Sequence, residues 1–153
     1  MTSLTDADLT ILQLDRTFDE LLRRWRVRMR RATRDALGEG VGPRAFPLLE
    51  QLIEQGPLSP TDLAQRLDLR TSTITAHIDR LEELGWASRE SQGRKGVLVS
   101  ASTEGRAAHQ RFLELRRTML RDLVAPLAKG DVQELGRLFE LLLQALRSGG
   151  DAK

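Results

Sequence analysis

The chain has 153 residues, of which 40% are hydrophobic and 30% charged, which is the balance of a globular protein rather than of a disordered segment. It contains no cysteine, so disulfides, thiolate metal sites and thiol catalysis are excluded. The net charge is only +2, so any binding to nucleic acid must depend on where the cations are placed.

The first predicted element is a long helix over residues 8–37. Its apolar side chains recur at spacings of three and four, which is the period of a helix with one apolar face. Because the helix exceeds the usual length, we expect its far end to pack outside its own domain, most simply on a partner subunit. Residues 21–34 hold seven arginines and no acid. In one interpretation these arginines line solvent or pair with acids of the second subunit. In the other, some of them contact DNA phosphates or hold an anionic effector.

Two shorter helices are predicted next. The first covers residues 44–55 and ends at a Gly-Pro pair. The second begins after Ser59, which is followed by a proline and then by Asp62 at the third helical position. This arrangement is typical of a capped helix N-terminus.

The helix predicted over residues 71–84 has two different faces. Ile74, Ile78 and Leu81 lie on one side at 100° per residue, so we expect them to be buried. Small polar side chains occupy the opposite side. Such a helix is suited to entering a groove of nucleic acid.

From Trp86 to Ser100 the hydrophobic period changes to about two, which predicts a β-hairpin with its turn at residues 91–96. A long helix is predicted over residues 102–127. A capping box at residues 131–134, after Gly130, is expected to open the last helix. The apolar face of that helix is too wide for one packing partner, so we expect it to lie between subunits.

The order of these elements, with the segments Gly56–Leu67, Ser72–Trp86 and Val97–Ser100, resembles the MarR family of bacterial transcriptional regulators. The resemblance covers nearly the whole chain. It implies a mainly α fold with a small β-hairpin wing, namely a winged helix-turn-helix flanked by helical dimerisation arms. The expected domains are an N-terminal dimerisation helix (1–40), a DNA-binding domain (41–101) and C-terminal dimerisation helices (102–153).

The resemblance implies a homodimer that places one recognition helix per subunit in successive major grooves of a pseudo-palindromic double-stranded DNA operator. Members of the family are mostly repressors. Many release DNA when a small aromatic or phenolic effector binds. No cofactor and no metal are implied.

Two positions of the recognition helix depart from the family's pattern. Arg70 stands where the family usually has a serine cap, and Ala76 stands where it usually has an arginine. Ala76 offers only van der Waals contact, for example to a thymine methyl group. His77 is either a base reader or a partly buried residue hydrogen-bonded to the protein. The predicted DNA-binding residues are Arg70, Thr71, Ser72, Thr73, Thr75, Ala76, His77, Arg80, Arg94 and Lys95.

The predicted wing also departs from the family, because its turn is about two residues shorter and has Gly93 where an acid is expected. Arg94 and Lys95 remain at the tip. They either contact the minor groove or phosphates, or form a solvated turn. In the family an acid that matches Asp79 pairs with a cation at the base of the wing, and here we expect Lys95 or Arg94 to be that cation.

The family's effector site lies between the dimerisation arms and the DNA-binding domain. The matching residues here are Trp25, Arg28, Phe46 and His109. An aromatic wall with a cation suits an aromatic carboxylate. The alternative is that Trp25 and Phe46, which stand at helical core spacing, only fill the core.

An enzyme is not expected, because the two histidines are 32 positions apart and there is no tyrosine, glycine-rich phosphate loop or acidic cluster. No apolar run reaches the roughly 18–20 residues of a membrane span, and the polar start does not resemble a signal peptide, so we expect a cytoplasmic location and no membrane partner. The alternative function is a winged-helix dimer that has lost DNA affinity and binds another protein. Ala76, the short wing and the balanced charge of residues 61–100 favour that alternative.

Overall fold

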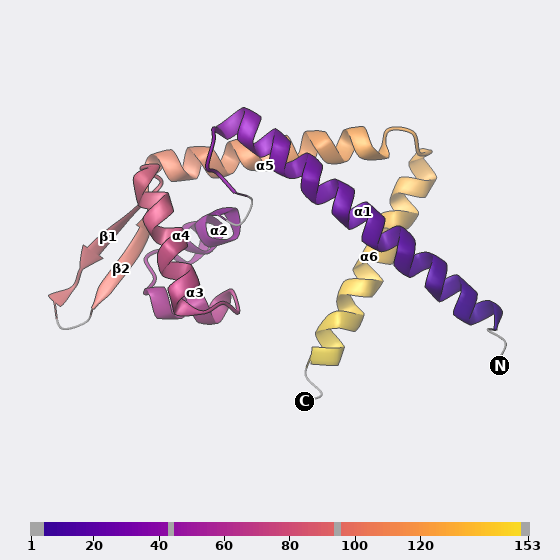
Figure 1. The fold of residues 1–153 in the computed structure, drawn as a ribbon, viewed down its shortest axis with the longest axis horizontal. Helices are drawn as coiled ribbons and strands as arrows, with labels where there is room; N and C mark the ends of the chain where they lie inside the picture. Colours follow the sequence, from indigo (N-terminus) through magenta and orange to yellow (C-terminus); the bar gives the residue numbers. More distant parts are fainter. Residues whose placement is uncertain (1–4, 43–44, 94–95, 151–153) are drawn as a thin grey trace. The chain divides into compact units, whose positions relative to one another are not determined.

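The computed structural model describes residues 5–42, 45–93 and 96–150 (Figure 1). It divides into two compact units, residues 1–115 and 116–153. The elements in chain order are α1 (Asp6–Leu37), α2 (Ala45–Gln55), α3 (Pro60–Arg66), α4 (Thr71–Glu83), β1 (Ala87–Ser91), β2 (Val97–Ala101), α5 (Thr103–Val124) and α6 (Lys129–Gly150). This mainly helical fold with one β-hairpin is the predicted class.

Helix α1 begins two residues before its predicted start, because a capping box fixes its N-terminus. The Thr5 hydroxyl accepts a hydrogen bond from the Asp8 amide at 3.2 Å, and the Asp8 carboxylate accepts one from the Thr5 amide at 2.9 Å. The helix ends at Gly38, whose φ of +100° is accessible mainly to glycine. Several large apolar side chains of its first half are exposed, namely Leu9, Ile11, Leu12, Leu14, Phe18 and Leu21.

The core of the first unit is formed mainly by α2, α3, α4 and the hairpin, with buried side chains added by α1 and the first half of α5. Leu49 and Leu52 of α2, and Leu63 of α3, have no solvent-exposed surface. The predicted inner face of α4 is confirmed, since Ile74, Ile78 and Leu81 are also fully buried. The predicted cap of α3 is confirmed as well, because the Ser59 hydroxyl accepts a hydrogen bond from the Asp62 amide at 3.1 Å.

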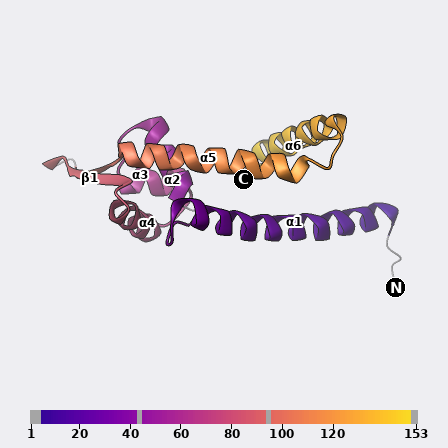
Figure 2. The same cartoon turned by 90° about the horizontal axis from the view of Figure 1, so that it is seen from above.

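Strands β1 and β2 pair antiparallel, with Arg89 opposite Val99, and the hairpin extends away from the helices (Figure 2). Its base is joined to the segment before α3. The Leu58 amide donates to the Val99 carbonyl at 3.1 Å, and the Val99 amide donates to the Leu58 carbonyl at 2.8 Å. These two backbone hydrogen bonds therefore join the base of the wing to the helix-turn-helix.

The start of α5 is fixed against the turn between α4 and β1. The Ser102 hydroxyl donates to the Gly85 carbonyl at 2.6 Å and accepts from the Gly105 amide at 2.9 Å. A Cβ atom at position 105 would lie 2.1 Å from the Trp86 carbonyl oxygen. Only glycine therefore permits this approach of α5 to the turn.

The second unit contains the end of α5 and helix α6. The predicted capping box at residues 131–134 was wrong, because α6 begins at Lys129 and Asp131 lies within its first turn. Glu134 instead accepts hydrogen bonds from Arg137 at 2.6 and 2.8 Å. Large apolar side chains of α6 are exposed, namely Leu138, Phe139, Leu141, Leu142, Leu143 and Leu146. Among the described helices, none has the length and apolar character of a membrane span.

Candidate nucleic-acid interface

The N-terminus of α4 is open to an anion. Arg70 occupies the N-cap position in an extended conformation, and within the described residues no side chain caps the helix by accepting a hydrogen bond from its first amides. The first turn also has no acidic residue. The positive end of the helix dipole and the unpaired first amides are therefore available to a phosphate group.

The exposed face of α4 is mostly polar, and its side chains are short. Thr71, Ser72, Thr75 and Ala76 are exposed, and Thr73 is half-buried. The Thr75 hydroxyl donates to the Thr71 carbonyl at 2.9 Å, so its oxygen keeps only acceptor capacity for a ligand. The short side chains let the backbone of α4 approach a groove closely.

Arg80 is held within the protein. Its guanidinium donates to Glu83 Oε2 at 2.6 Å, to the Gly40 carbonyl at 3.3 Å and to the Glu39 carbonyl at 3.4 Å. These bonds join α4 to the segment that follows α1. Contact of Arg80 with DNA stays a prediction and would require some of these bonds to be replaced.

His77 is half-buried, but the structure does not supply the hydrogen bond that one interpretation expected. Its Nε2 atom is buried and has no hydrogen-bond partner within the described part of the chain. An unpaired buried nitrogen is costly. The role of His77 as a base reader stays a prediction.

The wing is braced against α4 by Arg89, which the sequence analysis missed. Its Nη2 donates to Asp79 Oδ1 at 2.6 Å, its Nη1 pairs with Glu82, and its amide donates to Glu82 Oε1 at 2.9 Å. Among the described residues the partner of Asp79 is Arg89, whereas Lys95 and Arg94, its expected partners, lie outside those residues, so that pairing stays a prediction. The signal was present, because Asp79 and Glu82 are three residues apart on one helix face.

The positive charge of Arg89 is stabilised by Asp79 and Glu82. Burial by itself would lower the pKa of Arg89, but the hydrogen bond to Asp79 and the charges of Glu82 and Asp79 outweigh that effect and raise the pKa. The two carboxylates thus stabilise the charged form of the guanidinium. Arg94 and Lys95, the predicted contacts of the wing tip, lie outside the described residues.

The predicted effector residues have different environments. Phe46 is buried and stacks on Phe112 with a centroid distance of 3.7 Å, and it lies 6.1 Å from the ring of Trp86. His109 is buried, Trp25 is half-buried and Arg28 is exposed. Phe46 thus has a clear packing role. In the part of the chain that the structure describes, no group of three or more histidine, cysteine or acidic side chains is placed to hold a metal ion.

Comparison with known proteins agrees with the arrangement of α4 and the wing described above. A family model described as the MarR family matches residues 39–96. YpoP of Bacillus subtilis, named an uncharacterized HTH-type transcriptional regulator, is 30% identical over 63% of this chain and 70% of its own length. PecS of Dickeya dadantii, an HTH-type transcriptional regulator, is 30% identical over 62% of this chain. The match spans 60% of PecS, and that to the repressor YetL of Bacillus subtilis spans 48% of its length.

Solved structures share the fold. A MarR family protein from Bacillus stearothermophilus has a TM-score of 0.77 at 20% identity, over 95% of this chain and 99% of that chain. FabT of Streptococcus pneumoniae, solved in complex with DNA, has a TM-score of 0.73 at 16% identity, over 90% and 98% of the two chains. The fold is thus a winged helix-turn-helix. With the family model and the YpoP match, the chain belongs to the MarR family.

Proposed function

We propose that this protein is a sequence-specific DNA-binding transcriptional regulator that acts in the cytoplasm. The observation that carries the proposal is the exposed face of α4, where small polar side chains follow an uncapped helix N-terminus. Arg70 and the free amides of the first turn would bind phosphate, and Thr71, Ser72 and Thr73 would reach base edges. FabT, which has the same fold, has been solved with DNA, and this also supports the proposal.

The wing would provide the second contact. Arg89 orients the hairpin relative to α4, so α4 and the wing would meet one DNA duplex together. Arg94 and Lys95 at the predicted tip are expected to reach the flanking minor groove or phosphates, on the strength of the family resemblance.

We propose that the active form is a homodimer. The exposed apolar side chains of α6, with Leu146 at 73% and Leu142 at 58% exposure, and those of the first half of α1 support it, because such surfaces are usually buried against a partner. Residues 1–40 and 102–153 would then be the dimerisation arms and residues 41–101 the DNA-binding domain. Two recognition helices about 34–36 Å apart would fit a pseudo-palindromic operator.

We propose that the protein acts as a repressor, in line with the names of the relatives YetL and MdtR of Bacillus subtilis. The family resemblance further predicts release by a small aromatic or phenolic ligand at Trp25, Arg28, Phe46 and His109. Because Phe46 stacks on Phe112, we assign the ring of Phe46 to the core rather than to a ligand contact. The aromatic-ligand prediction therefore depends mainly on Trp25 and Arg28.

The test of DNA binding is fluorescence anisotropy of the full chain with the DNA upstream of its own gene and with a shuffled control, at several salt concentrations. Saturable binding that prefers the upstream DNA and weakens with salt is expected. Equal, weak binding to both probes, followed by an empty screen of genomic fragments, would overturn the proposal. That result would favour the alternative, a protein-interaction module. An exposed alanine such as Ala76 fits a protein contact better than a hydrogen-bonding side chain would.

A further inference from the structure

Helix α4 carries almost none of the side chains that usually read a base pair in the major groove. Arginine or lysine is the common reader of guanine, and asparagine or glutamine is the common reader of adenine, because each can form two hydrogen bonds with one base. Residues 71–83 contain no lysine, asparagine or glutamine. The nitrogen-bearing side chains of this helix are Arg80 and His77 alone.

Neither of these two side chains presents a free pair of hydrogen-bonding groups to a base. The Arg80 guanidinium donates to Glu83 at 2.6 Å and to the Gly40 carbonyl at 3.3 Å. Gly40 lies so close to this guanidinium that there is no room for a Cβ atom at position 40. One of the two ring nitrogens of His77, Nε2, is buried. His77 therefore cannot form two hydrogen bonds with one base.

The acidic side chains of α4, which could accept a hydrogen bond from cytosine, are occupied as well. Asp79 accepts from Arg89 at 2.6 Å, and Glu82 pairs with the same guanidinium. Glu83 is bound by Arg80. Each of the three acids of the helix therefore already has a cationic partner.

The exposed face of α4 that remains consists of hydroxyl and methyl groups. Ser72 and Ala76 are exposed and lie four residues apart, so they share one face of the helix. Thr75 is exposed as well, but its hydroxyl hydrogen is donated to the Thr71 carbonyl at 2.9 Å. The Thr75 side chain therefore cannot donate to N7 or O6 of guanine, which only accept. Ala76 offers a methyl group and no polar atom.

We propose that α4 selects its operator half-site through the methyl group of a thymine, by van der Waals contact with Ala76, and that it makes no two-hydrogen-bond contact with guanine. The inference rests on the proposed DNA-binding function and names the kind of half-site that α4 selects. Among the four bases only thymine carries a methyl group in the major groove. Contact with Ala76 removes this methyl group from water, which is favourable. Hydrogen bonds from α4 to bases then come from hydroxyl groups such as that of Ser72.

The test begins with selection of the preferred half-site from a random library of double-stranded DNA by the full chain. Each thymine of that half-site is then replaced singly by deoxyuridine, which removes the methyl group and keeps every hydrogen-bonding atom. At one position at least, we expect an affinity loss of about fourfold, the value for one buried methylene group. Fluorescence anisotropy at one salt concentration measures the loss. A half-site in which guanines carry the specificity and every deoxyuridine is tolerated would overturn the proposal.

The variant Ala76→Gly connects this loss to one side chain. In this variant the sensitive deoxyuridine should cause no further loss, because the methyl group that it would have contacted is already absent. The matched control is Ala107→Gly, which changes an exposed alanine of α5 and should keep the full deoxyuridine effect. An equal effect in the two variants would assign the thymine contact to another residue and overturn the role of Ala76. Circular dichroism shows whether each variant is folded.

The variant Ala76→Arg tests the same contact by a gain of specificity. It introduces the common reader of guanine, so selection with this variant should return guanine at the base pair that held the sensitive thymine. An unchanged half-site would overturn the proposal, because the side chain at position 76 would then not face that base. If the unchanged chain selects no sequence at any salt concentration, the proposed function itself fails, and not only this mode of reading.

Discussion

The guanidinium of Arg89 on β1 lies 2.6 Å from the carboxylate of Asp79 on α4, so the wing is tied directly to the recognition helix. Glu82, one turn further along α4, receives both the side chain and the amide of Arg89. The Arg89 side chain is 27% exposed, and the paired side chain of Glu82 is 31% exposed. This partly buried cluster has less competition from water than the exposed ion pairs of the other helices.

Replacement of Arg89 by glutamine should destabilise the first unit. We expect the free energy of unfolding to fall by about 1–2 kcal/mol, because Asp79 and Glu82 lose a shared cation in a partly dry site. Urea unfolding at one fixed protein concentration measures the change. The control is Arg137→Gln, which removes an exposed pair with Glu134 on α6 and should leave the midpoint unchanged. Equal midpoints for the two variants would contradict the proposed brace.

Ser72 is predicted to read sequence. The variant Ser72→Ala should reduce the preference for operator over random DNA by about 1–3 kcal/mol if the hydroxyl bonds to a base edge, with little change on random DNA. Anisotropy with both probes at one salt concentration gives the comparison. Ser148→Ala, an exposed serine of α6, is the matched control. An equal loss on both probes would assign Ser72 to a phosphate contact instead.

Removal of α6 should abolish the dimer. A chain ending after Leu127 lacks the exposed apolar residues of α6, and size-exclusion chromatography with light scattering should show that the dimer of the full chain is lost. A chain ending after Arg147 keeps these residues and should remain a dimer. A dimer that survives the removal of α6 would place the main interface elsewhere, with the exposed face of α1 as the next candidate.

Local patterns predicted much of this fold, because they depend on neighbours in the sequence. The burial of Ile74, Ile78 and Leu81 follows from helical periodicity, and the cap at Ser59 follows from residues within one turn. The box at residues 131–134 failed because the helix had already begun, which left Glu134 free to pair with Arg137. Several helix starts are compatible with such a short pattern.

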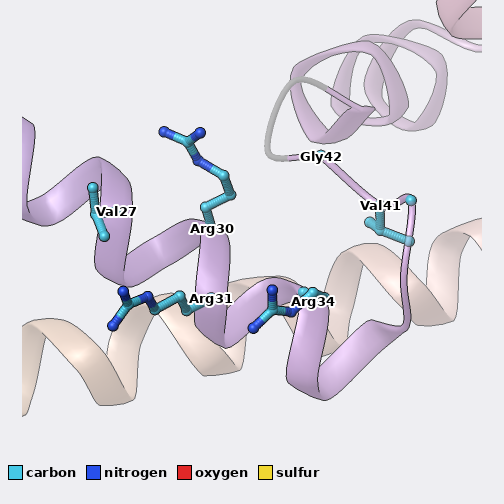
Figure 3. Close-up of a pocket in the computed structure, with 7 residues that line it drawn as sticks. Val27, Arg30, Arg31, Arg34, Val41 and Gly42 are labelled. Atoms are coloured by element: carbon cyan, nitrogen blue, oxygen red, sulfur yellow. The ribbon is translucent and has the colours of Figure 1, made fainter.

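The parts of the site that were missed depend on contacts between distant residues. The partner of Asp79 is set by the register of the hairpin, which places Arg89 against α4, and this register cannot be read from the strand sequences alone. A pocket that Arg30, Arg31 and Arg34 of α1 line likewise arises where residues 40–42 return past that helix (Figure 3). The sequence indicated an unusual run of arginines but did not indicate what faces them.

Thr33 provides a test of packing in α1. It is fully buried, and its hydroxyl has no hydrogen-bond partner in the described part of the chain. Thr33→Val keeps the shape and removes an unpaired polar group, so stability should rise by about 1 kcal/mol. The control is Thr17→Val, whose exposed hydroxyl donates to the Gln13 carbonyl at 2.8 Å and whose loss should give no gain. A loss of stability in Thr33→Val, measured by urea unfolding, would show that the hydroxyl has a partner in solution.

The backbone bonds between Leu58 and Val99 have a consequence for the dynamics of the wing. Leu58 lies in no helix, yet its amide proton is held by the strand that forms the inner edge of the hairpin. Its exchange with deuterium should therefore be as slow as that of the Val99 amide, because both protons are released only when the wing separates from the helix-turn-helix. The base of the wing and the helices that carry it thus open together, as one cooperative unit.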